Sequence, residues 1–119
     1  MKPGINFGGR SHWVAVSALD CQAKAKSERY PMWLRVHYAA LGWTNRVGHA
    51  GFSEGKLAEI LGYAGHPNGK QHTNKAIRKA IELDLIHRDS GARCLVLPSH
   101  QAQQSGHGSA DCKVHGIRA

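Results

Sequence analysis

The chain has 119 residues and a formal net charge of +8, from 16 Lys and Arg against 8 Asp and Glu. This length predicts one domain with appendages, and the excess of base suggests a polyanionic partner. No run approaches the ~18 apolar residues that span a membrane, and three cysteines without close pairing do not make a secreted disulfide framework. The apolar stretch 13–19 imitates a signal peptide but is short and is followed by Asp20, so we expect a reduced, cytoplasmic protein.

The positive charge is concentrated in one segment. Residues 66–80 contain four Lys or Arg and no Asp or Glu, a local charge of +4 and half of the net charge. The later part of this segment has the apolar spacing of a helix. A basic helical face can also be only a solvated surface, so the neighbouring elements decide its interpretation.

The first half of the chain predicts one clear helix. The stretch 13–19 shows no clean periodicity, and we interpret it as a short extended segment that covers the core. A helix is expected over 27–41, with Ser27 as its N-cap and Pro31 in its first turn, where a donor can be spared. Gly42 is expected to end this helix.

The second half predicts a short strand, two helices and a hairpin. Residues 50–52 could form the strand, and Ser53 then caps a helix that runs to about Leu61. After a turn rich in Gly, Pro and Asn, a third helix is expected from about Gln71 or Thr73 to Leu83. A hairpin follows, with strands over 85–88 and 93–97.

This order of elements is typical of a winged helix-turn-helix, so the predicted fold class is mainly α with a small β-sheet. The resemblance is carried by FSEGKLAEILG at 52–62, similar to a support helix, and by AIRKAIELDLI at 76–86, similar to a recognition helix running into its wing. Asp84 departs from the Gly usual at that place, although Asp tolerates the left-handed region better than most residues. The turn over 62–71 is also longer than that of the compact motif.

The third helix is expected to enter the major groove of double-stranded DNA, which is ~12 Å wide and admits one helix. Its outward N-terminal part offers side chains suited to base edges: Gln71, His72, Asn74, Lys75 and Arg78. Phosphate contacts are expected from Lys70 and Lys79, and from Arg88 and Arg93 on the wing. The predicted function is a phage or bacterial transcriptional regulator. The alternative is a protein-interaction module of the same fold that engages a host or replication partner, and a homodimer is possible.

The chain divides into an extension over 1–26, the winged-helix domain over 27–98 and a Cys/His-containing tail over 99–119. The composition of the tail alone predicts disorder. Its residues nevertheless extend a pattern C-x5-H-x11-C-x2-H, which offers the four nitrogen and sulfur ligands of a structural zinc site: Cys94, His100, Cys112 and His115. The spacing is not that of a standard finger and could arise by chance in a His-rich tail, and His107 is an alternative ligand. Cys21 and His37 are interpreted as partly buried core residues.

The same region resembles one family more specifically. SGARCLVLPSH at 90–100, followed after a spacer by CKVH at 112–115, looks like small helix-turn-helix proteins of actinobacterial phages and their hosts, which have a GARCLVVPxH wing and a terminal Cys-x-x-His. The resemblance implies that the four candidate ligands belong to one unit, which fits a metal site without demonstrating one.

Nothing in the sequence indicates an enzyme. No Gly-rich phosphate loop precedes a helix in the required form, and no Cys or Ser nucleophile has a recognisable partner. The nearest enzymatic alternative is a histidine- and metal-dependent nuclease acting through the tail. That reading would need a carboxylate beside the candidate ligands, where the chain offers only Asp111.

Overall fold

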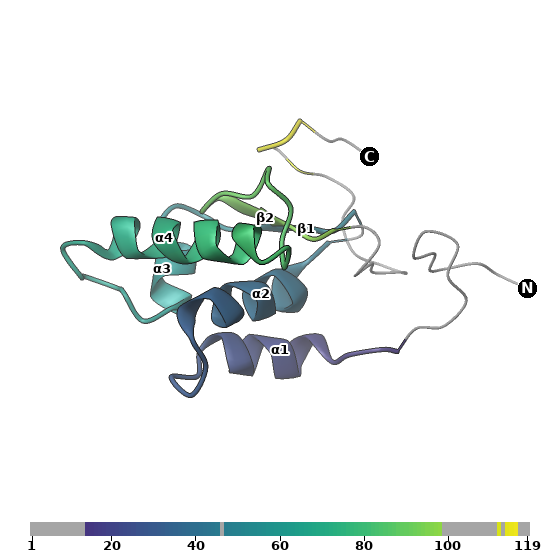
Figure 1. Cartoon of the computed structure of the whole chain (residues 1–119), viewed down its shortest axis with the longest axis horizontal. Coiled ribbons are helices and arrows are strands. Elements are labelled where there is room, and N and C mark those ends of the chain that lie inside the picture. Colours follow the sequence, from purple (N-terminus) through teal and green to yellow (C-terminus); the bar gives the residue numbers. More distant parts are fainter. Residues whose placement is uncertain (1–13, 46, 99–111, 113, 117–119) are drawn as a thin grey trace, which may run out of the picture.

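The computed structural model describes residues 14–45, 47–98, 112 and 114–116. This part of the chain is mainly helical, with four helices and a two-stranded antiparallel sheet (Figure 1). The elements follow one another as α1 (Ala18–Ala25), α2 (Met32–Trp43), β1 (His49–Gly51), α3 (Lys56–Ile60), α4 (Gly69–Glu82) and β2 (Cys94–Val96). Among the described residues, no helix is both long and apolar enough to cross a membrane.

Helix α2 is the centre of the molecule. It contacts α1 on one side and α4 on the other, and also touches β1 (Figure 1). Its small residues Ala39 and Ala40 and its Val36 are fully buried, and they pack in one apolar core with residues of α3, α4 and β2. Close packing of this kind needs small side chains where helices approach each other, which explains the alanines in the middle of α2.

The stretch expected to be extended instead leads into a helix. Ser17 caps α1, since its Oγ accepts a hydrogen bond from the amide of Asp20 at 3.1 Å. A Ser followed three residues later by an acidic residue is a helix-start signal, and it outweighs the poor periodicity of 13–19. Ala25, at the end of α1, is fully buried in the core although it lies in the segment set apart as an extension.

Helix α2 begins later and ends later than predicted. Its N-cap is Pro31, not Ser27, because a residue that precedes proline is disfavoured in the helical region. Gly42 does not end the helix but lies inside it, buried against α1. A Cβ at Gly42 would lie 2.8 Å from Cγ and 2.9 Å from the backbone nitrogen of Gln22, whose Nε2 donates to the Gly42 carbonyl at 2.7 Å. The glycine therefore serves the close approach of α1 and α2.

The predicted hairpin is present only in part. Residues 85–88 form no strand, and what remains of the hairpin is an isolated antiparallel bridge between Gly91 and Cys94 and a hydrogen bond from the His87 amide to the Val96 carbonyl at 2.7 Å. As a strand, β2 pairs with β1, with Ala50 opposite Leu95. All three residues of β2 are buried, because Leu95 points into the main core while Cys94 and Val96 face a second cluster with Cys112. A strand buried on both faces is held by tertiary packing, which a local turn signal does not reveal.

Other predictions are confirmed. The helices expected near 53–61 and 71–83 exist as α3 and α4, with ends shifted by a few residues, although the N-cap of α3 is Gly55 and not Ser53. Asp84 follows α4 with φ of 60°, the left-handed conformation that Asp tolerates. His37 is half-buried and its Nδ1 lies 3.0 Å from the carbonyl of Leu85, as expected of a core histidine, and Cys21 is buried.

Candidate metal centre and basic helix face

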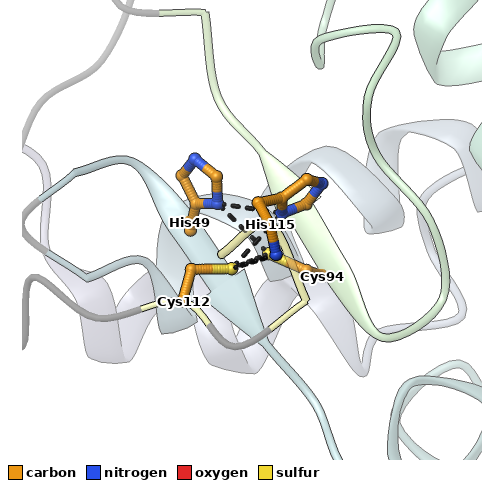
Figure 2. A group of neighbouring side chains, drawn as sticks. All are labelled: His49, Cys94, Cys112 and His115. Carbon is orange, nitrogen blue, oxygen red and sulfur yellow. Dashed lines mark hydrogen bonds between the residues drawn. The ribbon is translucent and has the colours of Figure 1, made fainter. Parts of the chain in front are cut away.

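Four nitrogen and sulfur side chains converge beside the sheet. His49 comes from β1, Cys94 from β2, and Cys112 and His115 from the C-terminal segment, and Figure 2 shows them pointing toward one another. In the antiparallel register His49 lies opposite Val96, two residues from Cys94. Residues two apart on a strand share a face, so the register places His49 and Cys94 on the same side of the sheet.

The ligand atoms are closely spaced. The two sulfur atoms of Cys94 and Cys112 are 3.5 Å apart, and Cys94 Sγ is 3.5 Å from His49 Nδ1. His115 Nδ1 lies 3.3 Å from Cys112 Sγ and 3.1 Å from His49 Nδ1. All four atoms lie within 4.8 Å of one another. Such a group of imidazole and thiol donors could hold a metal ion.

The backbone orients His115 for this role. Its Nε2 lies 2.9 Å from the carbonyl oxygen of Asp89. Because a carbonyl only accepts hydrogen bonds, Nε2 donates, so that in the neutral imidazole the lone pair of Nδ1 faces the other three side chains, and in the protonated imidazole Nδ1 donates to Cys112 Sγ. A carbonyl partner behind a ligating histidine is the usual means of fixing the tautomer. The amide of His115 also donates to Cys112 Sγ at 3.4 Å, which favours the thiolate.

The two thiols differ in acidity. Burial and the hydrogen bond with Cys112 raise the pKa of Cys94 to about 12. Burial also acts to raise the pKa of Cys112, but hydrogen bonds from the side chain and backbone of His115 outweigh it and leave this pKa below its ordinary value. Cys112 is thus the thiol that ionises first. Cys94 loses its proton when a metal cation takes the place of that proton on the sulfur.

The two imidazoles shift in opposite directions. Burial, together with the nearby His115, lowers the pKa of His49. The hydrogen bond to the Asp89 carbonyl, followed by the contact with Cys112, raises the pKa of His115. A lowered pKa keeps His49 neutral, which is the form that binds a metal ion.

The structure brings together three of the four predicted ligands, Cys94, Cys112 and His115. The fourth member of the cluster is His49, which sequence analysis missed, whereas His100, His107 and Asp111 lie outside the described residues. The observation that identifies His49 as a member of the cluster is the pairing of β1 with β2. Once that pairing is known, His49 is the one residue of β1 with a ligating side chain on the side that faces Cys94.

The predicted DNA-contacting residues of α4 share one exposed surface. Thr73, Ala76, Ile77 and Ala80 are buried on the opposite side of the helix. The exposed residues between positions 70 and 79 form what we call the α4 face: Lys70, Gln71, His72, Asn74, Lys75, Arg78 and Lys79. The α4 face carries four cations and no carboxylate, and the single acid of the helix, Glu82, stands at its C-terminal end, 3.8 Å from Lys79.

The two arginines expected on the wing lie in turns before β2. Both are exposed. Arg93 is fixed by a hydrogen bond from Nε to the carbonyl of Phe52 at 3.0 Å, and with Lys70 and Thr73 it lines a hollow of about 480 Å³ beside the start of α4. Arg93 is therefore adjacent to the α4 face. Arg88 lies in the turn that replaces the predicted strand.

The chain was compared with family models, curated proteins and solved structures. No family model, no curated protein and no solved structure matches it.

Proposed function

We propose that this chain is a zinc-containing winged helix-turn-helix protein that binds double-stranded DNA, in the role of a phage or bacterial transcriptional regulator. One observation carries the DNA-binding proposal, namely the exposed α4 face with four cations and no acid. Fourteen residues give a helix about 20 Å long, and such a helix fits the major groove, which is ~12 Å wide.

The α4 face combines two kinds of side chain that DNA recognition uses. Gln71 and Asn74 can pair with adenine and Arg78 with guanine, whereas Lys70 and Lys79 suit phosphates. In this proposal α3 supports α4, and the turn over 87–93 takes the place of the wing, with Arg93 held beside the start of α4.

The distances in the Cys/His cluster support zinc as the metal. Zinc bonds of about 2.3 Å to sulfur and about 2.05 Å to nitrogen, arranged as a tetrahedron, give edges of about 3.8 Å for S–S, about 3.5 Å for S–N and about 3.3 Å for N–N. Four of the six observed separations are 3.5 Å for S–S, 3.3 and 3.5 Å for S–N and 3.1 Å for N–N, and the other two, both S–N, are within 4.8 Å. The ion would hold the C-terminal segment against the sheet and would have a structural role.

A salt titration of duplex binding tests the DNA proposal. With phosphate contacts from Lys70, Lys79, Arg88 and Arg93, the slope of log K against log salt should be about −3.6, which weakens binding about 150-fold between 50 and 200 mM salt. Lys79→Ala should reduce the slope by about 0.9 and weaken binding to all sequences alike, whereas Arg78→Ala should change sequence preference.

The matched control is Lys24→Ala, which removes a cation from α1 on the far side of α2 (Figure 1). This variant should keep the wild-type slope. Absence of duplex binding by the zinc-loaded protein at low salt would overturn the proposal, and would favour a protein-interaction module of the same fold instead.

A further inference from the structure

A second site lies away from the α4 face, where the turn between α1 and α2 meets the end of α3. A hollow of about 730 Å³ opens there, lined among others by Lys26, Arg35, Lys56 and the two tyrosines Tyr30 and Tyr63. Neither the metal cluster nor the α4 face contributes to it. Three cations and two carboxylates, those of Glu28 and Glu59, line the hollow, which leaves one positive charge in excess.

Arg35 is the unusual member of this set. The residue is 3 % exposed, and its guanidinium makes two hydrogen bonds, from Nε to the carbonyl of Ala25 at 2.9 Å and from Nη1 to the Met32 sulfur at 3.4 Å. In the described part of the chain no carboxylate lies within ion-pair distance of it, and Nη2 has no acceptor. Burial accordingly lowers the pKa of Arg35, an effect that the more distant Glu28 opposes.

An uncompensated buried cation is costly, and proteins normally pair such a group or expose it. The two bonds of Arg35 go to a carbonyl and a thioether, neither of which carries a charge. Arg35 is among the residues that line the hollow, so an anion that enters comes close to the unused donors of its guanidinium.

The N-terminus of α2 points to the same kind of ligand. Its N-cap is Pro31, which has no side chain to cap the first turn, and this turn has no acidic residue. In the described residues the amides of Met32 and Trp33 have no acceptor, and Met32 lines the hollow beside Arg35. Free amides at a helix N-terminus bind anions through their N–H groups and the helix dipole.

We propose that this hollow binds the phosphate group of a small phosphomonoester. Two sets of donors meet at the N-terminal end of α2, the free amides of Met32 and Trp33 and the guanidinium of Arg35, and a phosphate has enough oxygens to accept from both. The hollow is larger than a phosphate alone requires, and Tyr30 and Tyr63, whose rings also contact Tyr38 and His72, are among its lining residues and can pack against an organic group. The site is independent of the proposed DNA binding.

Amide NMR of the full-length protein tests the site with two probes, inorganic phosphate and glycerol phosphate, against sodium chloride of equal ionic strength. We expect saturable shifts of the Met32 and Trp33 amides, with tighter binding of glycerol phosphate. Arg35→Gln should weaken phosphate binding about tenfold to a hundredfold, as expected for a lost charge-assisted hydrogen bond. Lys79→Ala, on the α4 face, should leave it unchanged.

Arg35 also supports the junction of α1 and α2 through Ala25, so Arg35→Gln could fail to fold. Lys26→Ala, which leaves that hydrogen bond in place, should still weaken phosphate binding severalfold without changing the amide spectrum of the free protein. Shifts that do not saturate, or that are the same in both variants as in the wild type, would overturn the proposal. Competition by duplex DNA for these amides would also overturn it, because the phosphate would then be that of the DNA backbone.

Discussion

His49→Ala is the variant that tests the metal centre most directly, because His49 belongs to the cluster in the structure whereas His100 belongs to the set predicted from sequence. A ligand that binds only the folded state at a hundredfold excess over its Kd stabilises that state by about 2.7 kcal/mol. Loss of a residue that only orients a metal ligand weakens binding tenfold to a hundredfold, and loss of a ligand itself should do no less.

A hundredfold weaker site at the same zinc concentration would be half occupied and would contribute about 0.4 kcal/mol. His49→Ala should therefore lose about 2.3 kcal/mol of the zinc-dependent stabilisation. For a chain of this length, roughly 4 °C in Tm corresponds to 1 kcal/mol, so the zinc-dependent rise in Tm should shrink by about 9 °C.

The assay is thermal unfolding with and without zinc, followed by circular dichroism, together with the zinc content of the purified protein. His100→Ala is the matched control, since it removes a histidine of the same C-terminal region that is not one of the four residues of the described cluster. The reasoning is refuted if His49→Ala retains the full zinc-dependent rise in Tm while His100→Ala loses it. A wild-type protein whose Tm does not respond to zinc would refute the metal centre altogether.

Two further predictions concern the fold. Gly42→Ala should destabilise the protein by about 1–3 kcal/mol, because its Cβ would lie 2.9 Å from the backbone of Gln22; urea unfolding measures this, and an unchanged midpoint would contradict the close contact of α1 and α2. Burial lowers the pKa of His37, so below about pH 6.5 the unfolded chain takes up a proton that the folded chain does not, and stability falls with falling pH. His37→Gln should flatten this part of the stability profile relative to the wild type, and identical slopes would show that His37 is not responsible.

The sequence predicted best those elements whose signals are local. Helix α4 has an apolar stripe, an amphipathic pattern and a Gly-rich turn before it, and each of these lies within a few residues. The position of Asp84 after the helix likewise predicted a residue in the left-handed conformation, and its φ is 60°. Helix α1 carries a local signal too, the Ser17 cap, which the interpretation of 13–19 from periodicity did not use.

The pairing of the strands could not be predicted in this way. A Gly-containing turn between two apolar runs favours a hairpin, of which the structure keeps only the bridge between Gly91 and Cys94 and one further hydrogen bond. Strand β2 is held mainly by its pairing with β1, by Leu95 in the core and by Cys94 in the second cluster. These contacts are made with residues far away in the chain, and the local pattern of turn residues does not indicate them. The same non-local pairing brings His49 to the cluster, and for this reason one member of the cluster was missed while the three in β2 and the C-terminal segment were predicted.

The pairing of β1 with β2 also determines which part of the chain the metal ligands enclose. His49 and Cys94 are 45 positions apart, and the segment between them contains the whole of α3 and α4. An ion bound to both would join the two ends of that segment and remove much of the entropy that the unfolded chain gains from separating them. Proteolytic cleavage in the exposed turn before α4 would then leave two fragments connected through the ion, with α4 still attached to the strand that carries Cys94.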